Sequence, residues 1–266
     1  MGKDMPDYLE SCVVNYKMTA WYYIRIIWAL SIWLLVLILP VACYASSKDE
    51  SANGELTKHI MFAGYEWEVK SGQEHPGKNY WDKDNVWVDR DGWLHLKVSH
   101  KQGRWYCAEL VSMRSFGYGT YQFQVVGAID KLDRNLVLGL FVYPEHEIPN
   151  NEIDIEFAQW GNSNKPRGNY TVASNTQQYD LALQGDYTLH QFEWSSRQIA
   201  FQSYHGHEID GSKKIANWIY AISEDKDKAP VPPVRVHMNF WLYLGETPTD
   251  NCEKEIVIRN FSFTPM

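Results

Sequence analysis

From residue 46 onward the chain is a series of short runs in which apolar and polar residues alternate. Strict alternation is typical of strands that bury one face. Asp91-Gly92, between two such runs, predicts a hairpin. The pattern predicts strands at 86–88, 93–98, 108–113, 119–126, 136–143, 152–159, 169–173, 190–194, 198–203, 235–242 and 255–263. We expect a short helix at 215–220 and a charged, proline-rich loop at 223–233.

Many strands without long amphipathic helices predict an all-β sandwich or barrel, and residues 46–266 suit a single domain. A sandwich with one concave sheet would provide a groove that holds a polymer along its length.

The N-terminal region has a different pattern. Residues 26–45 contain no charged residue, follow Lys17 and Arg25, and precede Lys48. The run is intermediate in length between a signal-peptide core and a transmembrane helix. We therefore expect 1–45 to be a signal peptide or, if uncleaved, a membrane anchor through residues 26–45. Because the basic residues precede the run, we expect 46–266 to be exported to the periplasm, the cell surface or the medium.

Residues 152–156 read Glu-Ile-Asp-Ile-Glu. On a strand, Glu152, Asp154 and Glu156 share one face. The α-carbons of the two glutamates lie about 13 Å apart, and inward-leaning side chains bring the carboxylates to about 5 Å. This matches the separation in a retaining glycosidase, where one carboxylate attacks the sugar and the other protonates the leaving oxygen. A calcium or magnesium site and a solvated strand face are the alternatives. Clustered like charges oppose folding, which favours the catalytic interpretation.

Composition narrows the class of partner. The net charge of −8 argues against nucleic acid and anionic membranes. The many aromatic residues suit stacking on sugar rings, although most of them pack in a core. Cys107 and Cys252 follow the N-terminal run, and they are able to pair in an oxidising compartment.

Four motifs occur in order along the chain. They are Cys107-Ala-Glu109 with Ser112 and Tyr118–Tyr121, then Glu152–Phe157, then His190–Trp194 with Ile199, and finally His237–Trp241. Together they resemble glycoside hydrolase family 16, a family of concanavalin A-like β-jelly-roll endo-glucanases and galactanases that includes lichenases, laminarinases and xyloglucan endotransglycosylases. The resemblance covers residues 60–264 and implies an antiparallel jelly roll with a retaining mechanism.

The resemblance also implies roles for particular residues. Glu152 would be the nucleophile, Asp154 its assistant and Glu156 the acid/base. Glu109 and Asn239 match positions that hydrogen-bond sugar hydroxyls, Trp241 matches an aromatic platform, and Tyr170 matches a groove tyrosine. Trp160 has the strand parity of the carboxylates and would line the groove beyond Glu156. For Tyr170 and Trp160, packing in the core is an equal alternative.

The chain departs from lichenases at several of the positions that contact sugar or link strands. Asn150 replaces a tryptophan, Val111 replaces an arginine, and Asn79 lies near the place of a second cysteine that would pair with Cys107. The resemblance implies no required cofactor. Many members carry a structural calcium ion, whose site this sequence does not locate.

The sequence therefore predicts an exported, monomeric, endo-acting retaining β-glycosidase whose polysaccharide substrate is a β-glucan. A transglycosylase of the same fold is the close alternative. A non-catalytic carbohydrate-binding protein and a calcium-dependent adhesion module are alternatives of other classes.

Overall fold

The computed structural model describes residues 57–144, 151–222 and 230–266. All of them lie in one compact unit. The predicted leader at 1–45, Asn150 and most of the predicted loop at 223–233 lie outside the described residues. Within the described ranges, no helix combines the length and the apolar composition that crossing a bilayer requires.

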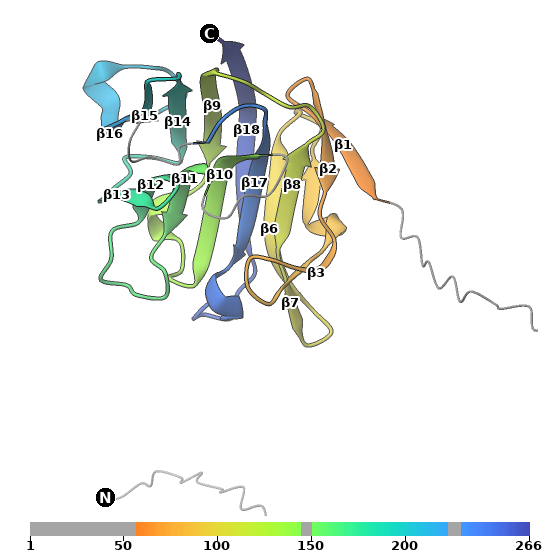
Figure 1. The fold of residues 1–266 in the computed structure, drawn as a ribbon. Coiled ribbons are helices and arrows are strands. Elements are labelled where there is room, and N and C mark those ends of the chain that lie inside the picture. The colour runs from red at the N-terminus through yellow and green to blue at the C-terminus, as the bar shows by residue number, and fades with distance from the viewer. Residues whose placement is uncertain (1–56, 145–150, 223–229) are drawn as a thin grey trace, which may run out of the picture. The chain divides into compact units, whose positions relative to one another are not determined.

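Two antiparallel sheets pack face to face (Figure 1). The first sheet contains, in spatial order, β1 (Lys58–Phe62), β2 (Tyr65–Val69), β8 (Ala108–Ser112), β17 (Val234–Leu242), β10 (Leu136–Pro144), β11 (Ile153–Ala158), β12 (Gly168–Val172) and β13 (Asn175–Tyr179). The second sheet contains β16 (Lys214–Ala221), β15 (Gln198–His205), β14 (Tyr187–Trp194), β9 (Gly119–Val126), β18 (Lys254–Pro265), β6 (Leu94–Lys101) and β5 (Val86–Val88). The predicted all-β sandwich is confirmed.

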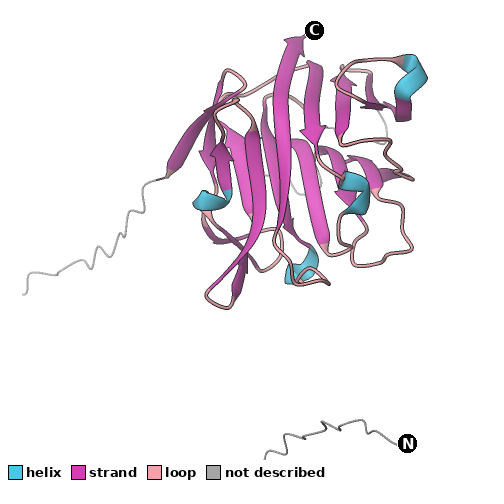
Figure 2. Ribbon diagram, turned by 180° about the vertical axis from the view of Figure 1, so that it is seen from behind, coloured by secondary structure: helices cyan, strands magenta, loops and turns pink. Residues whose placement is uncertain are grey.

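Shorter elements join these sheets. The strand β7 (Arg104–Tyr106) pairs with β6, and β3 (Gly72–Glu74) pairs with β4 (Asn79–Trp81). Single 3₁₀ turns occur at Lys83–Asn85, Ile129–Lys131, Gly211–Lys213 and Tyr243–Gly245, and Figure 2 shows how little helix the described chain contains.

The core lies between the two sheets and follows from alternation within each strand. In β9, Tyr121, Phe123 and Val125 are fully buried while the residues between them are half-buried on the outer face. The Tyr121 ring stacks on Phe192 of the neighbouring β14 at 4.6 Å between ring centroids. Each such side chain contributes about 1.5–3 kcal/mol when it leaves water. Between the sheets, Trp67 of β2 packs edge to face on Phe261 of β18 at 5.6 Å between ring centroids, so aromatic contacts also hold the two sheets together.

The helix predicted at 215–220 is wrong, because this segment is the strand β16, paired with β15. Exposure alternates along it with a period of two, so that Trp218 and Tyr220 are half-buried on one side and Ile219 is exposed on the other. The Trp218 ring stacks on Phe201 at 5.5 Å. Aromatic and β-branched residues favour a strand here over a short helix. The strands β1, β2, β3, β4, β7 and β13 were not predicted from the sequence.

The possible Cys107–Cys252 disulfide is also absent, since both cysteines are free. Cys107 is buried and its thiol donates a hydrogen bond to Asn79 Oδ1 at 3.4 Å, whereas Cys252 is exposed. Burial raises the pKa of the Cys107 thiol to about 12. Asn79, which lies near the place of a cysteine in the resemblance, is therefore the partner of Cys107, and the contact is a hydrogen bond.

Close packing between β9 and β18 gives a test of this fold. A β-carbon on Gly119 would lie 2.4 Å from the carbonyl oxygen of Thr264 and 2.7 Å from the Phe263 ring. We expect Gly119→Ala to lower the free energy of unfolding by about 1–3 kcal/mol, measured by denaturant titration of the full chain. Gly117→Ala is the matched control, because a β-carbon on Gly117 would meet no atom within 4 Å. Equal stability of the two variants would contradict this packing.

Candidate active site

The carboxylate row lies in the middle of the first sheet. Asp154 pairs with Phe141 on β10, and Glu156 pairs with Gly139 on the same strand. Glu152 directly precedes β11, and its carbonyl oxygen accepts a hydrogen bond of 2.9 Å from the backbone N–H of Ala173. The ladder of the sheet therefore extends to Glu152, and the three residues keep the two-residue spacing of a strand.

The apolar partners of this row face the opposite way. Ile153, Ile155 and Phe157 are fully buried in the core between the sheets. Since successive strand residues point to opposite faces, the three carboxylates project from the outer face of the first sheet. The structure thus brings Glu152, Asp154 and Glu156 together on one surface, as the alternation in the sequence predicts.

Burial and mutual repulsion hold protons on these carboxylates. Burial raises the pKa of Glu152. Burial, together with the charges of Glu152 and Glu156, holds the pKa of Asp154 well above its usual range. Burial and the charge of Glu152 raise the pKa of Glu156 to about 8. A glutamic acid with such a pKa is protonated at neutral pH, which is the state that a general acid requires.

Two buried oxygen atoms beside the row have no hydrogen-bond partner among the described residues: Asp154 Oδ2 and Asn239 Oδ1. Asn239 on β17 pairs with Gly139, which in turn pairs with Glu156, so these residues form one row across three strands. A β-carbon on Gly139 would lie 2.5 Å from Asn239 Oδ1. The absence of a side chain at Gly139 therefore leaves room for the Asn239 carboxamide on the sheet surface next to Glu156.

Glu109 continues the same row on β8, where it pairs with Asn239. The Glu109 carboxylate is buried and accepts hydrogen bonds of 3.1 Å from Lys70 Nζ and 3.1 Å from His237 Nδ1. Burial acts to raise its pKa, but the His237 hydrogen bond and the Lys70 charge outweigh burial and leave the pKa below its ordinary value. Glu109 is therefore an ionised carboxylate with two cationic or polar partners from the protein itself.

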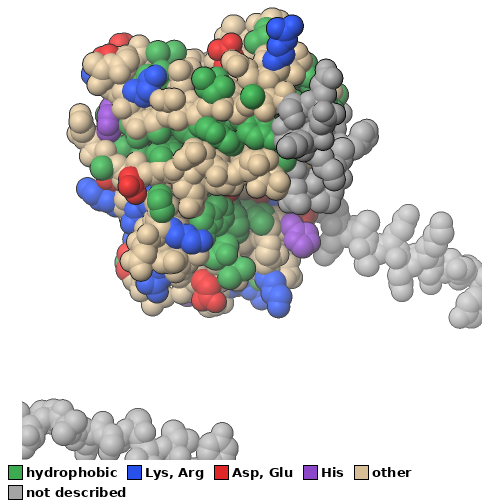
Figure 3. Space-filling view, turned by 60° about the vertical axis from the view of Figure 1, so that its left-hand side comes forward, with side chains coloured by type: hydrophobic (Ala, Val, Ile, Leu, Met, Phe, Trp, Pro, Cys, Tyr) green, Lys and Arg blue, Asp and Glu red, His purple; other side chains and the backbone are tan. Residues whose placement is uncertain are grey.

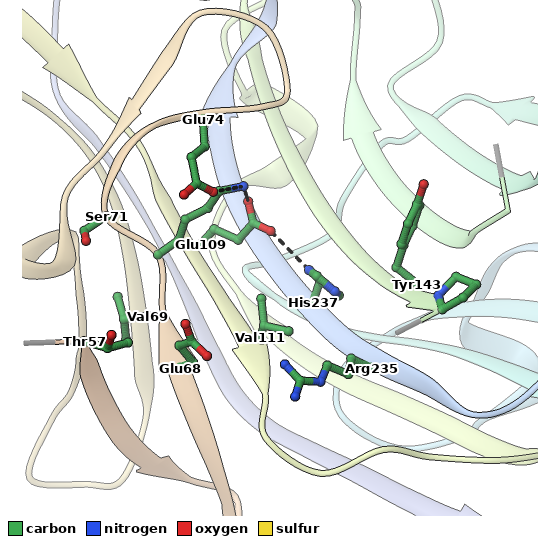
Figure 4. Close-up of a pocket in the computed structure, with 12 residues that line it drawn as sticks. Thr57, Glu68, Val69, Ser71, Glu74, Glu109, Val111, Tyr143, Arg235 and His237 are labelled. Carbon is green, nitrogen blue, oxygen red and sulfur yellow. Dashed lines mark hydrogen bonds and ion pairs between the residues drawn. The ribbon is translucent and has the colours of Figure 1, made fainter. Parts of the chain in front are cut away.

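A cavity of about 670 Å³ opens beside Glu109 (Figure 4). Its lining comes from β2, β8 and β17 and from the end of β10, and includes Glu68, Lys70, Val111, Arg235 and His237. The carboxylate row on β11 is not part of this lining. The cavity and the row share the outer face of the first sheet, so this surface holds two separate groups of polar side chains.

The remaining predicted site residues are divided between this face and the core. Trp241 is half-buried and lies two residues beyond Asn239 on β17, hence on the same face. Trp160 lies in the turn after β11, and its indole N–H donates to Asn169 Oδ1 at 3.4 Å. Asn169 pairs with Glu156. Trp160 is thus near the Glu156 end of the row. The alternation of a strand predicts this position from the sequence, but β11 ends at Ala158, two residues before Trp160.

Tyr170 lies in the core between the sheets and not on the outer face of the first sheet. It pairs with Ile155, is fully buried, and stacks on Phe201 at 4.9 Å between ring centroids. Its hydroxyl donates to Ser203 Oγ at 2.6 Å inside the core. The prediction of a groove tyrosine is wrong because Tyr170 has the strand parity of Ile155 and not of the carboxylates.

Three polar residues of the site were not singled out from the sequence: Lys70, Arg235 and His237. Lys70 follows β2, a strand that the alternation did not reveal. His237 and Arg235 have the parity of Asn239 on β17, so a consistent use of that parity would have placed both on the site face.

No protein-family model matches the sequence, and no curated protein matches it. Solved structures do match. A prokaryotic β-1,3-1,4-glucanase (lichenase) derived from a mouse hindgut metagenome is 23% identical with a TM-score of 0.56, covering 75% of this chain and 93% of that one. A glycoside hydrolase family 16 endo-glucanase from Bacteroides ovatus is 16% identical with a TM-score of 0.55, covering 74% and 94%.

A protein of Mycobacterium tuberculosis, described as an immunostimulatory antigen and pseudo-β-1,3-glucanase, is 17% identical with a TM-score of 0.56, covering 73% of this chain and 88% of that one. At these identities the likeness is one of fold. The described part of the chain has the jelly-roll fold of family 16 glucanases, which confirms the fold to which the sequence motifs pointed.

Two further observations concern metal ligands and the molecular surface. In the described ranges, no three or more His, Cys, Asp or Glu side chains are placed to hold a metal ion. Figure 3 shows one face on which hydrophobic side chains gather in bands and charged side chains lie apart from one another.

The raised pKa of Glu156 links the site to stability. A carboxyl group with a pKa of about 8 in the folded chain and 4.5 in its ordinary state destabilises the fold as pH rises from about 4.5 to 8. We expect Glu156→Gln to raise the free energy of unfolding by about 2 kcal/mol at pH 9 and to change it little at pH 4. Denaturant titrations at both pH values measure this.

Glu193→Gln is the control for that comparison, because Glu193 is exposed on β14. If Glu156→Gln raises the free energy of unfolding at pH 9 no more than it does at pH 4, the Glu156 carboxylate is not held in an unfavourable environment.

Proposed function

We propose that the protein is an endo-acting retaining β-glycosidase that hydrolyses a β-linked polysaccharide, namely a β-glucan. The observation that carries the proposal is the row of three carboxylates on one face of β11, with raised pKa values caused by burial and mutual repulsion. A row of buried like charges opposes folding, so its presence is best explained by chemistry. The jelly-roll fold of solved glucanases supports the same conclusion.

The proposed reaction uses the three side chains in different protonation states. Ionised Glu152 attacks the anomeric carbon and forms a covalent glycosyl-enzyme, while protonated Glu156 donates its proton to the leaving oxygen. Glu156, now ionised, takes a proton from water as the water attacks the anomeric carbon and releases Glu152. Asp154 lies between them with its own pKa raised, and as a neutral carboxylic acid it would donate a hydrogen bond to the Glu152 carboxylate during the reaction.

The surroundings suit a sugar polymer. Asn239 presents an unpartnered amide oxygen beside Glu156, and Trp241 presents a half-buried indole on the same face. An acceptor for hydroxyl groups next to an aromatic plane is the combination that binds sugar rings. We further propose that the protein is exported, with residues 1–45 as signal peptide or membrane anchor, and acts as a monomer.

A transglycosylase of the same fold, in which a sugar displaces Glu152 in place of water, is the close alternative. A non-catalytic carbohydrate-binding protein is an alternative of another class. The similar fold of the M. tuberculosis protein described as a pseudo-glucanase supports the non-catalytic alternative.

Product analysis on a panel of mixed-linkage glucan, laminarin, xyloglucan, agarose and carrageenan tests the proposal. We expect the protein to release oligosaccharides from a β-glucan, and we expect Glu152→Gln to reduce the rate by at least about 10³-fold because the nucleophile is lost. The retained fold of the variant is verified by its circular dichroism spectrum. Turnover by Glu152→Gln close to that of the unmodified protein would refute the nucleophile assignment.

Leaving-group dependence tests the role of Glu156. We expect Glu156→Gln to slow cleavage of natural glucan far more than formation of the glycosyl-enzyme from aryl glycosides with acidic leaving groups, which need little protonation. Pre-steady-state release of the phenol measures that first step. Equal losses on both kinds of substrate would contradict the role of general acid. Bound polysaccharide without products from any polymer would indicate the non-catalytic alternative.

A further inference from the structure

Two oppositely charged side chains face the cavity near Glu109 without contacting each other. Glu68 on β2 and Arg235 on β17 both line the cavity, and Figure 4 shows them on either side of Val111. Among the described residues neither forms an ion pair within 4.0 Å or a side-chain hydrogen bond, and Arg235 Nε is buried without a partner. A buried donor without a partner is unfavourable in the free protein, and a ligand oxygen would satisfy it.

The strand register explains why these two groups face each other. Glu68 pairs with Val111 on β8, and Val111 pairs with His237 on β17. Arg235 precedes His237 by two residues and therefore shares its face. The short side chain of Val111 lies between Glu68 and Arg235, so the space above it stays open for a ligand.

The other charges that line the cavity already have partners. Lys70 Nζ lies 3.1 Å from a Glu109 oxygen and 3.7 Å from a Glu74 oxygen, and His237 Nδ1 lies 3.1 Å from the other Glu109 oxygen. The charged groups of the lining that have no charged partner are therefore the Glu68 carboxylate, which is an acceptor, and the Arg235 guanidinium, which is a donor.

An acceptor and a donor of opposite charge select a particular ligand chemistry. An anionic group placed at Arg235 would meet the uncompensated Glu68 carboxylate, and a cation placed at Glu68 would meet Arg235. A neutral ring with neighbouring hydroxyl groups satisfies both, because one hydroxyl donates to Glu68 and the next accepts from Arg235. The ligand favoured by this arrangement is thus a neutral sugar unit.

The position of the pair separates it from the reacting bond. In the first sheet β2, β8, β17, β10 and β11 are consecutive. With strands about 4.8 Å apart, β2 lies about 19 Å from the carboxylate strand. A sugar unit held by Glu68 is therefore several units of the polymer away from the cleaved bond.

We propose that Glu68 and Arg235 form a distal subsite that binds neighbouring hydroxyl groups of a neutral sugar unit and so selects long polysaccharide chains. This subsite rests on the proposed function, because it extends the groove of that glycosidase. It binds substrate without taking part in bond cleavage, so its loss affects long substrates and not short ones.

Affinity electrophoresis in native gels tests the subsite. The gels contain mixed-linkage glucan, laminarin, xyloglucan or carboxymethyl cellulose as probes, and the full chain is compared with Glu68→Ala and Arg235→Gln. We expect each change to weaken binding to a neutral glucan about ten-fold, as loss of a charge-assisted hydrogen bond does. We also expect unchanged hydrolysis of a short aryl β-glycoside. Glu193→Ala and Arg197→Gln, exposed residues on and beside β14, are the matched charge controls.

Four other results would decide between the subsite and the glycosidase proposal. Stronger binding of carboxymethyl cellulose by Glu68→Ala, with weaker binding by Arg235→Gln, would identify an anionic ligand and overturn the neutral-sugar subsite. Unchanged binding by both variants, with hydrolysis intact, would overturn the subsite and leave the glycosidase proposal standing. Weakened binding in a chain that hydrolyses nothing would support the subsite and refute the glycosidase. A full chain that binds and hydrolyses none of the polymers would refute both.

Discussion

The register of β11 between β10 and β12 is the constraint on which the site depends. A shift by one residue would turn Glu152, Asp154 and Glu156 into the core and Ile153 and Ile155 into solvent. The two isoleucines are buried in the same hydrophobic core as the aromatic side chains of the second sheet, and this packing excludes the shift. It holds the register in which Asp154 pairs with Phe141 and Glu156 pairs with Gly139. The energy of the core therefore holds three mutually repelling carboxylates on one surface. No interaction among the carboxylates themselves would keep them there.

Three of the six buried polar side-chain atoms that lack a hydrogen-bond partner among the described residues lie on the outer face of the first sheet. Asp154 Oδ2, Asn239 Oδ1 and Arg235 Nε are buried without partners among the described residues, and all three lie on that face. Buried polar groups are nearly always paired in folded proteins, so unpaired ones on a single surface indicate where a ligand completes the hydrogen bonding. Raised carboxylate pKa values and unpaired donors and acceptors on one surface both lower the stability of the fold, and both mark a candidate functional site.

Alternation was sufficient to predict the strands that bury one face, such as β9, whose predicted bounds match those of the structure. It failed for β13, which is polar and mostly exposed, and for β16, which was predicted as a short helix although its exposure alternates with a period of two. Parity placed the carboxylates correctly because they lie on one strand. It could not place Tyr170, whose face depends on how β12 pairs with β11, or link Lys70 to Glu109 across strands that are distant in sequence. Contacts between strands carry information that the pattern within a strand lacks.

Fold alone does not decide what this surface does, since similar sandwiches are found in a lichenase and in a protein described as a pseudo-glucanase. In the proposed glycosidase the chemistry would depend on β11, and distal sugar recognition would depend on β2, β8 and β17 at the other end of the face. Because these groups lie on different strands, changes at positions such as Val111 or Arg235 would alter the sugar that is bound without moving the carboxylates. The proposed reaction and the proposed sugar preference therefore rest on separate strands of one sheet, and each can change without the other.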